Sequence, residues 1–183
     1  TCCFLFAGKL IEKKHPEDIL KALELLKGQH VSRLHLLMVG TGPLEERLRK
    51  RVVDKKLPVT FAGFLNQTEI PNAYSVADCL ILPSDYGETW GLVVNEGMAC
   101  GLPAIVSDRV GCGPDLVTDG ETGFVFRFGD VEDLADKMLA LMNMEPEQRS
   151  EMGSTAHARV SSEYSIQRAV DNTVQAVLDV SGR

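Results

Sequence analysis

The sequence predicts an α/β protein built on a doubly wound, mostly parallel six-stranded sheet with helices on both faces. Short apolar runs of strand length alternate along the chain with segments whose apolar residues recur at helical spacing. The 183 residues suffice for one domain with a core, and 44% hydrophobic and 25% charged residues are typical of a globular chain. Strands that alternate with helices favour a parallel sheet with right-handed crossovers.

The six strands are expected at apolar runs bounded by glycine, proline or polar residues. The first run, C-C-F-L-F-A-G, and the second, L-H-L-L-M-V-G, both end at a glycine, and Pro83 ends the fourth. Runs with few polar residues are typical of strands that are buried on both faces. The expected strands are residues 2–8, 34–40, 59–63, 78–83, 103–107 and 122–126.

Seven helices are expected between and after these strands. Pro16 suits the first turn of the first helix, and Asp130 suits the N-cap of the fifth. Pro71 lies within the third range and is a candidate interruption of that helix. The expected helices are residues 16–27, 43–53, 67–74, 91–100, 130–142, 145–160 and 165–178.

The composition excludes several classes of protein. No apolar run is long enough to span a bilayer, and no basic leader precedes the first strand, so neither a membrane span nor a signal peptide is expected. The net charge of −7 and the lack of a basic stripe argue against a nucleic-acid partner. The five cysteines, an odd number without C-x-x-C spacing, indicate free thiols in a reducing compartment, and the four histidines predict no metal site. We therefore expect a cytoplasmic protein.

Glycines, lysines and carboxylates follow four of the predicted strands. In doubly wound sheets, ligands bind at the carboxyl ends of the strands. The candidate residues are Lys9, Lys13 and Lys14 after the first strand, G-T-G-P (40–43) after the second, Asp85, Gly87, Glu88 and Gly91 after the fourth, and residues 108–113 after the fifth. The sequence therefore predicts a ligand site at this edge.

The stretch E-T-W-G-L-V-V-N-E, residues 88–96, sets two carboxylates in an apolar segment. A helix that begins near Gly91 would present free backbone N–H groups to an anion, and Lys9 and Lys14 would add positive charge. A buried, unpaired carboxylate is costly, so Glu96 needs a partner. A phosphate would repel it, whereas a ribose diol would donate to it, and Glu88 would reach a second hydroxylated group. This order of groups points to a nucleotide-sugar.

Several motifs taken together resemble a known family. They are E-x7-E after a P-S strand end, E-G-M-A-C-G-L-P-A-I-V-S, G-C-G-P-D-L-V-x-D-G-x-T-G-F-V, G-K-L-I-E-K-K-H-P and F-A-G-F-L. The chain from about Phe6 to Leu139 resembles the C-terminal, donor-binding domain of retaining glycosyltransferases of the GT-B fold, in the glycosyl transferases group 1 family (family four). The resemblance implies one Rossmann-like half of that fold over residues 1–183, with the N-terminal acceptor domain absent from this chain.

The resemblance also implies roles for particular residues. Lys9 and Lys14 would bind the donor diphosphate, Glu88 the sugar hydroxyls and Glu96 the ribose. Lys9 stands where the family usually has Arg, and His15 stands where it usually has Gly. The local turn could therefore differ from that of the family. The remaining candidates are backbone or contact residues: Gly91, Leu92 and Val93 at the phosphates, with Thr89 and Trp90 beside them, Phe61, Gly63, Phe64 and Leu65 at the base, and Gly40 and Gly42 beside the donor.

The implied reaction transfers a hexose-type sugar from a nucleoside diphosphate, with UDP or GDP expected, to an acceptor with retained anomeric configuration. No cofactor and no metal are expected. The partners would be the donor and a saccharide or lipid-linked acceptor, which the missing domain would bind. The full-length protein could also make peripheral contact with the inner face of the cell membrane. Polysaccharide biosynthesis is the expected setting.

Plainer interpretations stay open at the sequence level. Glu88 could be a solvated loop residue, Glu96 could pair with a Lys or Arg, and the lysines could form a solvated face. V-G-T-G-P lacks the third glycine of a dinucleotide fingerprint. Cys112 and Trp90 are more simply packing residues. Two other functions are a nucleotide-sugar epimerase of the same fold and a non-catalytic nucleotide-binding module.

Overall fold

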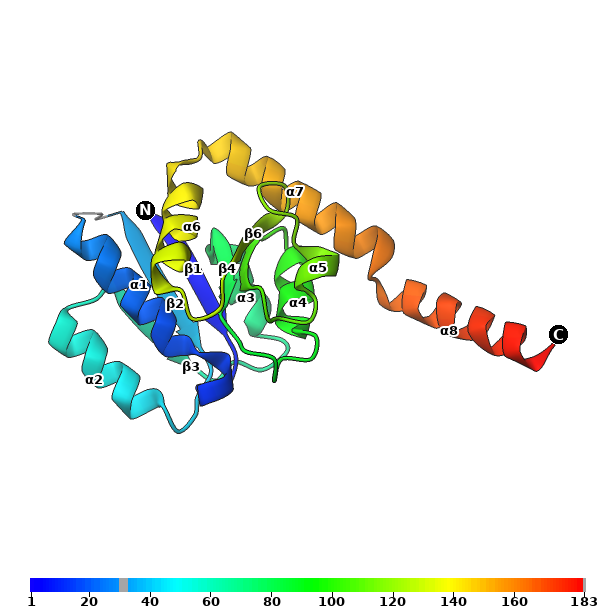
Figure 1. The fold of residues 1–183 in the computed structure, drawn as a ribbon, viewed down its shortest axis with the longest axis horizontal. Coiled ribbons are helices and arrows are strands. Elements are labelled where there is room, and N and C mark those ends of the chain that lie inside the picture. The colour runs from blue at the N-terminus through cyan, green and yellow to red at the C-terminus, as the bar shows by residue number, and fades with distance from the viewer. Residues whose placement is uncertain (30–32, 183) are drawn as a thin grey trace.

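The computed structural model describes residues 1–29 and 33–182, and its centre is a six-stranded parallel sheet (Figure 1). His30 lies outside the described residues. The strand order is β3-β2-β1-β4-β5-β6, and each neighbouring pair is parallel. The sheet confirms the predicted fold class, with strands β1 (Cys2–Ala7), β2 (Leu34–Val39), β3 (Val59–Gly63), β4 (Cys79–Leu82), β5 (Ala104–Ser107) and β6 (Gly123–Phe126).

The seven expected helices are present in the described ranges, with shifted ends. They are α1 (Pro16–Gly28), α2 (Glu45–Lys55), α3 (Ile70–Val76), α4 (Leu92–Ala99), α6 (Val131–Asn143), α7 (Pro146–Glu163) and α8 (Ile166–Ser181). Pro71 does not interrupt α3, because the helix begins at Ile70 and places the proline in its first turn, where a missing N–H costs nothing. The sequence did not predict the short helices η1 (Glu12–Lys14) and α5 (Gly113–Leu116).

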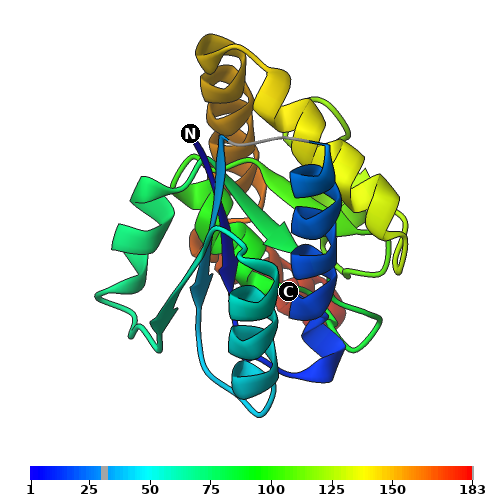
Figure 2. The same cartoon turned by 90° about the vertical axis from the view of Figure 1, so that its left-hand side faces the viewer.

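The sheet is covered on both faces, and β1 shows how the alternation of side chains builds two cores. Phe4 and Phe6 point to the cluster formed with α1, α2 and α6, whereas Leu5 and Ala7 point to the cluster formed with α3, α4 and α7. Figure 2 shows the sheet between these two layers. Both faces of the central strands are therefore buried, which explains their nearly continuous apolar sequence.

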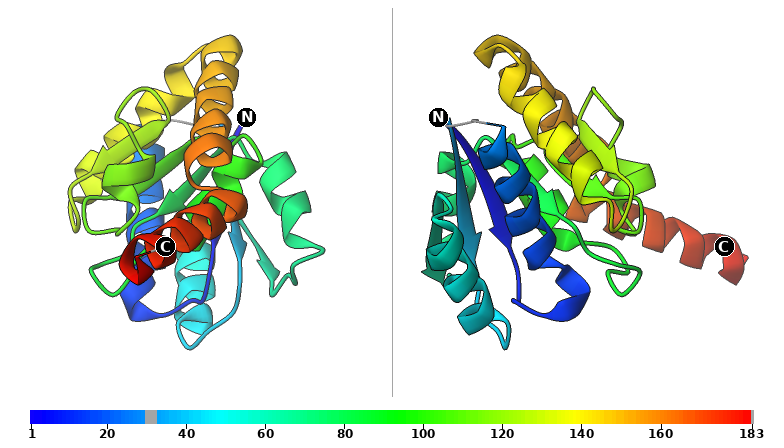
Figure 3. Two further views of the ribbon diagram at one scale, coloured as in Figure 1. Left: turned by 90° about the vertical axis from the view of Figure 1, so that its right-hand side faces the viewer. Right: turned by 60° about the vertical axis from the view of Figure 1, so that its left-hand side comes forward.

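Helix α8 extends away from the rest of the chain (Figures 1 and 3). None of its described residues is buried. Its exposed apolar side chains are Ile166, Val170, Val174, Val177, Leu178 and Val180. Helix α8 is therefore only loosely packed against the rest of the described chain. No helix in residues 1–29 and 33–182 is both long and apolar enough to cross a membrane.

Candidate functional site

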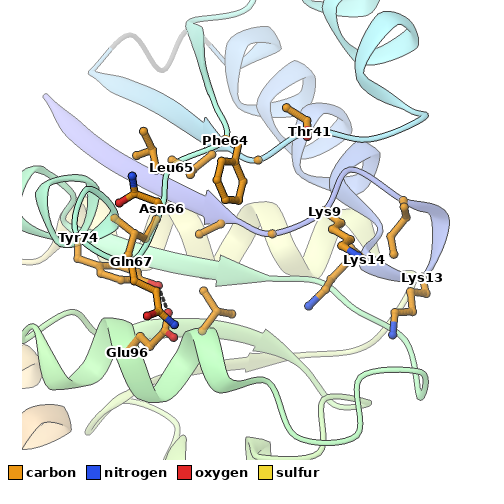
Figure 4. A pocket seen from close by; sticks show the side chains of 17 residues that line it. Lys9, Lys13, Lys14, Thr41, Phe64, Leu65, Asn66, Gln67, Tyr74 and Glu96 are labelled. Carbon is orange, nitrogen blue, oxygen red and sulfur yellow. Dashed lines mark hydrogen bonds between the residues drawn. The ribbon is translucent and has the colours of Figure 1, made fainter.

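A cavity of about 690 Å³ lies at the carboxyl edge of the sheet. The loops after β1 and β2 and the segment after β3 form its walls together with α3 and α4. The strand order reverses between β1 and β4, which is where ligands bind in such sheets. The lining residues include Lys9, Lys13, Lys14, Phe64, Tyr74 and Glu96 (Figure 4).

The loop after β1 brings three lysines to one end of the cavity. Lys9 is exposed at the end of β1, and Lys13 and Lys14 lie on the single turn of η1. The turn is bound to the loop after β4, because the N–H of Asp85 donates to the carbonyl of Lys13 at 3.0 Å and Lys13 Nζ donates to the carbonyl of Gly87 at 3.0 Å. The lysines are therefore held by two loops across the switch point of the sheet.

Lys14 and Glu88 form an ion pair across this switch point. Both side chains are largely buried, with 15% and 14% exposed, and the hydroxyl of Ser84 lies 3.5 Å from the same Glu88 oxygen. Glu88 is thus not a freely solvated loop residue. Lys14 lines the cavity and Glu88 does not, so Glu88 lies behind Lys14 and is linked to the cavity by their ion pair. An ammonium has three N–H donors, so Lys14 can hold Glu88 and still donate to a ligand.

His15 follows η1 in the left-handed conformation, with φ of 46°. Its Nδ1 lies 3.4 Å from Asp18 and its Nε2 lies 3.6 Å from Asp85, and its ring meets Phe128 edge-on at 4.7 Å between centroids. His15, which stands where the resembled family usually has glycine, therefore has a backbone conformation that glycine adopts most easily. The histidine keeps this turn and adds contacts to the loop after β4.

At the start of α4, the backbone of Gly91 packs closely against three buried side chains. Gly91 has φ of 105°, and a Cβ there would lie 3.1 Å from Leu82, 3.2 Å from Val110 and 3.4 Å from the sulfur of Cys112. Cys112 is fully buried, and burial raises the pKa of its thiol to about 12, which indicates a packing role. Val93, in the first turn of α4, lines the cavity.

Thr89, Trp90, Gly91 and Leu92 do not line the cavity in the described structure. Leu92 is 69% exposed. The indole N–H of Trp90 donates to Asn95 at 2.7 Å, and its ring lies 6.0 Å from that of Tyr164. Trp90 is therefore a packing residue beside the first turn of α4.

Glu96 lies at the other end of the cavity and is exposed. The hydroxyl of Tyr74 donates to Glu96 Oε2 at 2.6 Å. No ion pair within residues 1–29 and 33–182 involves Glu96, so its partner in the structure is a phenol. The apolar neighbours in sequence point into the core from the opposite side of α4, as Val94 and Met98 do. This explains how the carboxylate avoids burial.

The segment after β3 forms the wall between the two ends. Phe64, 73% exposed, and Leu65 line the cavity, and Asn66 and Gln67 extend the wall. Phe61 and Gly63 do not line it. The guanidinium of Arg49 covers the Phe61 ring at 4.4 Å.

The two glycines after β2 are packing positions. The N–H of Gly40 donates to the carbonyl of Gly63 at 2.7 Å, and a Cβ on Gly40 would lie 1.9 Å from the carbonyl oxygen of Gly8. Gly40 also lines the cavity. Gly42 does not line it, and a Cβ there would meet the backbone of Leu10 at 2.4 Å. These contacts bring the loops after β1 and β2 together.

The cavity thus has positive charge at one end, an oriented carboxylate at the other, and an apolar and amide wall between them (Figure 4). Sequence reasoning missed Tyr74, Asn66 and Gln67. The F-A-G-F-L motif ends directly before Asn66 and Gln67, and the E-x7-E spacing marked Glu96, but nothing local in the sequence links Tyr74 to Glu96. Among the described residues, no group of three or more His, Cys, Asp or Glu side chains is placed to hold a metal ion.

Known sequences match most of the chain. A relative from Arabidopsis thaliana, the sulfoquinovosyl transferase SQD2, is 38% identical over 141 residues, which are 74% of this chain and 27% of that protein. A D-inositol 3-phosphate glycosyltransferase from Pseudarthrobacter chlorophenolicus is 34% identical over 164 residues, 87% of this chain and 38% of that protein. The chain therefore spans well under half the length of these two relatives.

A solved structure of sucrose-phosphate synthase from Thermosynechococcus elongatus superimposes with a TM-score of 0.85 at 25% identity. The match covers 99% of this chain and 46% of that one. The C-terminal domain of a glycosyl transferase group 1 family protein from Francisella tularensis matches 90% of this chain with 87% of its own, at a TM-score of 0.78 and 22% identity. The fold, a parallel sheet covered by helices on both faces, is thus that of known glycosyltransferase domains. The sequence family described as Glycosyl transferases group 1 matches residues 3–159, and the chain belongs to that family.

Proposed function

We propose that this chain is the donor-binding domain of a glycosyltransferase that moves a sugar from a nucleoside diphosphate to an acceptor with retained anomeric configuration. The observation that supports this proposal is the layout of the cavity, with lysines at one end and Glu96 at the other. A nucleoside diphosphate has the same order of groups. Its phosphates need cations and N–H donors, and its ribose needs a hydrogen-bond acceptor.

Each part of the donor then has a partner. The diphosphate lies against Lys9, Lys14 and the first turn of α4, of which Val93 lines the cavity, and the ribose lies against Glu96. The base lies against the wall formed by residues 64–67. We expect UDP or GDP, and one relative, from Corynebacterium glutamicum, is named for its dependence on GDP-mannose.

Glu88 is assigned to the transferred sugar. Its carboxylate is held by Lys14, which in turn faces the cavity. A phosphate that accepts one N–H of Lys14 is therefore placed next to the carboxylate that accepts the sugar hydroxyls. The lysines and the helix amides take up the charge that develops on the leaving diphosphate, so the proposed transfer uses no metal and no cofactor. The leaving phosphate assists deprotonation of the acceptor on the same face of the sugar.

The acceptor is assigned to a second domain of the full-length protein. The relatives are more than twice as long as the match to this chain, which leaves room for such a domain. We expect a saccharide or lipid-linked acceptor there, and we expect α8 to reach towards it. Closure of a second domain excludes water and positions the reactants, so it contributes a large share of the rate.

Two other functions differ in their products. A nucleotide-sugar epimerase would return an altered sugar still bound to its nucleotide, and a non-catalytic module would return the donor unchanged. The ion pair of Lys14 with Glu88 and the exposed Glu96 favour a working site over a degenerate one. These functions are separated by incubating the full-length protein with a donor panel and analysing the nucleotides and sugars formed.

The test compares the 183-residue chain with the full-length protein. Calorimetry with UDP, GDP, ADP and their sugars should show binding of one nucleotide series to both. Free nucleoside diphosphate and a glycosylated product should form only with the full-length protein. Binding of no nucleotide would refute the proposed function, and transfer by the chain at the rate of the full-length protein would refute the assignment of the acceptor to a second domain.

A further inference from the structure

We propose that Tyr74 is a positioning residue that orients Glu96 towards the ribose, and that this contact makes the site selective for ribonucleotides over 2′-deoxyribonucleotides. The inference rests on the proposed function, because it assigns a ribose to Glu96. Beyond that function, it assigns a role to Tyr74 and a preference for ribonucleotides to the site. The observations that carry it are the fixed position of Tyr74, the exposure of Glu96 and the single hydrogen bond between them.

Tyr74 is held rigidly by the core. It lies on α3, is 2% exposed, and belongs to the cluster that packs α3 and α4 against the sheet. Its hydroxyl reaches the cavity and donates to Glu96 Oε2 at 2.6 Å. Burial and the neighbouring carboxylate raise the pKa of this phenol above its usual value, so the hydroxyl keeps its proton at neutral pH. Tyr74 is therefore a permanent donor at a fixed place.

Glu96 has no comparable support of its own. Its side chain is exposed, and no described Lys or Arg pairs with it. An exposed glutamate has many rotamers, and ordering it on ligand binding costs affinity. The bond to Tyr74 removes that disorder before the ligand arrives. It engages Oε2 and leaves Oε1 for a ligand in the cavity, which both residues line (Figure 4).

A fixed carboxylate distinguishes a diol from a single hydroxyl. A ribose offers two adjacent hydroxyls, and an oriented carboxylate accepts both, whereas a 2′-deoxyribose offers one. A mobile carboxylate would turn to whichever group is present and would lose much of this difference. The selectivity therefore depends on Tyr74 even though the expected ligand contact belongs to Glu96.

The experiment measures affinity ratios in the 183-residue chain. UDP, GDP and ADP are titrated in parallel with their 2′-deoxy forms against wild type, Tyr74→Phe and Glu96→Gln. Wild type should favour the ribonucleotide of the bound series by about tenfold, the size that one hydrogen bond to a charged group accounts for. Both variants should reduce that ratio to about twofold, mainly through weaker binding of the ribonucleotide.

Tyr164→Phe is the matched control. It removes a tyrosine hydroxyl that donates to Asp115 at 3.2 Å and does not line the cavity. It should leave the ratio unchanged. Thermal unfolding of Tyr74→Phe should stay close to wild type, because phenylalanine fills the same space.

The outcomes separate the inference from the proposed function. An unchanged ratio in Tyr74→Phe with a collapsed ratio in Glu96→Gln would overturn the role of Tyr74 and leave the ribose assignment standing. Unchanged ratios in both variants would overturn the ribose assignment and the inference together. A wild type that binds no nucleotide would overturn the proposed function itself.

Discussion

Lys14 is the most constrained cation of the cavity. Its side chain is largely buried, pairs with Glu88 and lines the cavity at the switch point of the sheet. We expect Lys14→Ala to weaken nucleoside diphosphate binding by about 1.5–3 kcal/mol, the worth of a hydrogen bond to a charged group. Lys9→Ala should do likewise. Lys13→Ala should change little, because Lys13 Nζ is already bound to the carbonyl of Gly87. Calorimetry measures all three.

An equal and small loss in all three lysine variants would contradict this prediction, since it would indicate a diffuse positive field. Lys14→Ala leaves Glu88 largely buried without its partner, which lowers stability. Its thermal unfolding is therefore measured beside its affinity, and Lys14→Ala combined with Glu88→Gln restores a neutral pair as the control.

The two carboxylates should separate by ligand. Glu88→Gln should spare the bare nucleoside diphosphate and weaken the sugar conjugate, because Glu88 is assigned to the sugar. Glu96→Gln should weaken both ligands, because both contain the ribose. Calorimetry with each ligand measures the difference. Identical effects of the two substitutions on both ligands would show that the assignment of roles is wrong.

At the scale of single residues, the sequence pointed to two carboxylates but not to the side chains that hold them. The E-x7-E spacing marked Glu88 and Glu96, but the partners come from other elements. Tyr74 lies 22 residues before Glu96, and Lys14 lies 74 residues before Glu88. Such contacts depend on the order of strands in the sheet, which local periodicity does not encode.

Among the connecting elements, the loops after β1 and β2 are held by a close approach of glycine backbone. Gly40 has φ of 120°, and a Cβ on it would lie 1.9 Å from the carbonyl oxygen of Gly8. Gly40→Ala should therefore lower the free energy of unfolding by about 3 kcal/mol or more, from backbone strain and overpacking together. Denaturant unfolding measures the loss.

Gly63→Ala is the matched control for this prediction. Gly63 also has a positive φ, of 73°, but a Cβ there meets nothing within 4 Å. Its substitution should cost about 1–2 kcal/mol, the strain of a left-handed residue alone. Similar losses at Gly40 and Gly63 would mean that the close approach to Gly8 does not constrain the loops.

Elements with strong patterns were predicted well, and short elements were not. The strands and long helices follow from apolar runs and helical spacing. Helices η1 and α5 have three and four residues, which is too few for a period to be read. The expected interruption of α3 at Pro71 was wrong. A proline breaks a helix in its interior but is tolerated in the first turn, where Pro71 lies.

At the scale of the whole molecule, the strand order β3-β2-β1-β4-β5-β6 places the site. Because the strand order reverses between β1 and β4, the connections that follow these two strands cross opposite faces of the sheet. The loop after β1 carries Lys14 and the loop after β4 carries Glu88. Alternation of strands and helices predicted the parallel sheet, but not this order. The exposed apolar residues of α8 are those expected of a helix that packs against another surface. That α8 reaches towards a second domain stays a prediction.

The most direct test of the proposed donor site is to map a nucleoside diphosphate on the labelled 183-residue chain by NMR. UDP, GDP and ADP are titrated in turn, and the backbone amide shifts are followed. We predict that one of them moves the amides of Lys9–Lys14, residues 64–67 and the first turns of α4, all at the carboxyl edge. Shift changes confined to the opposite edge of the sheet, or no saturable change with any of the three, would contradict it.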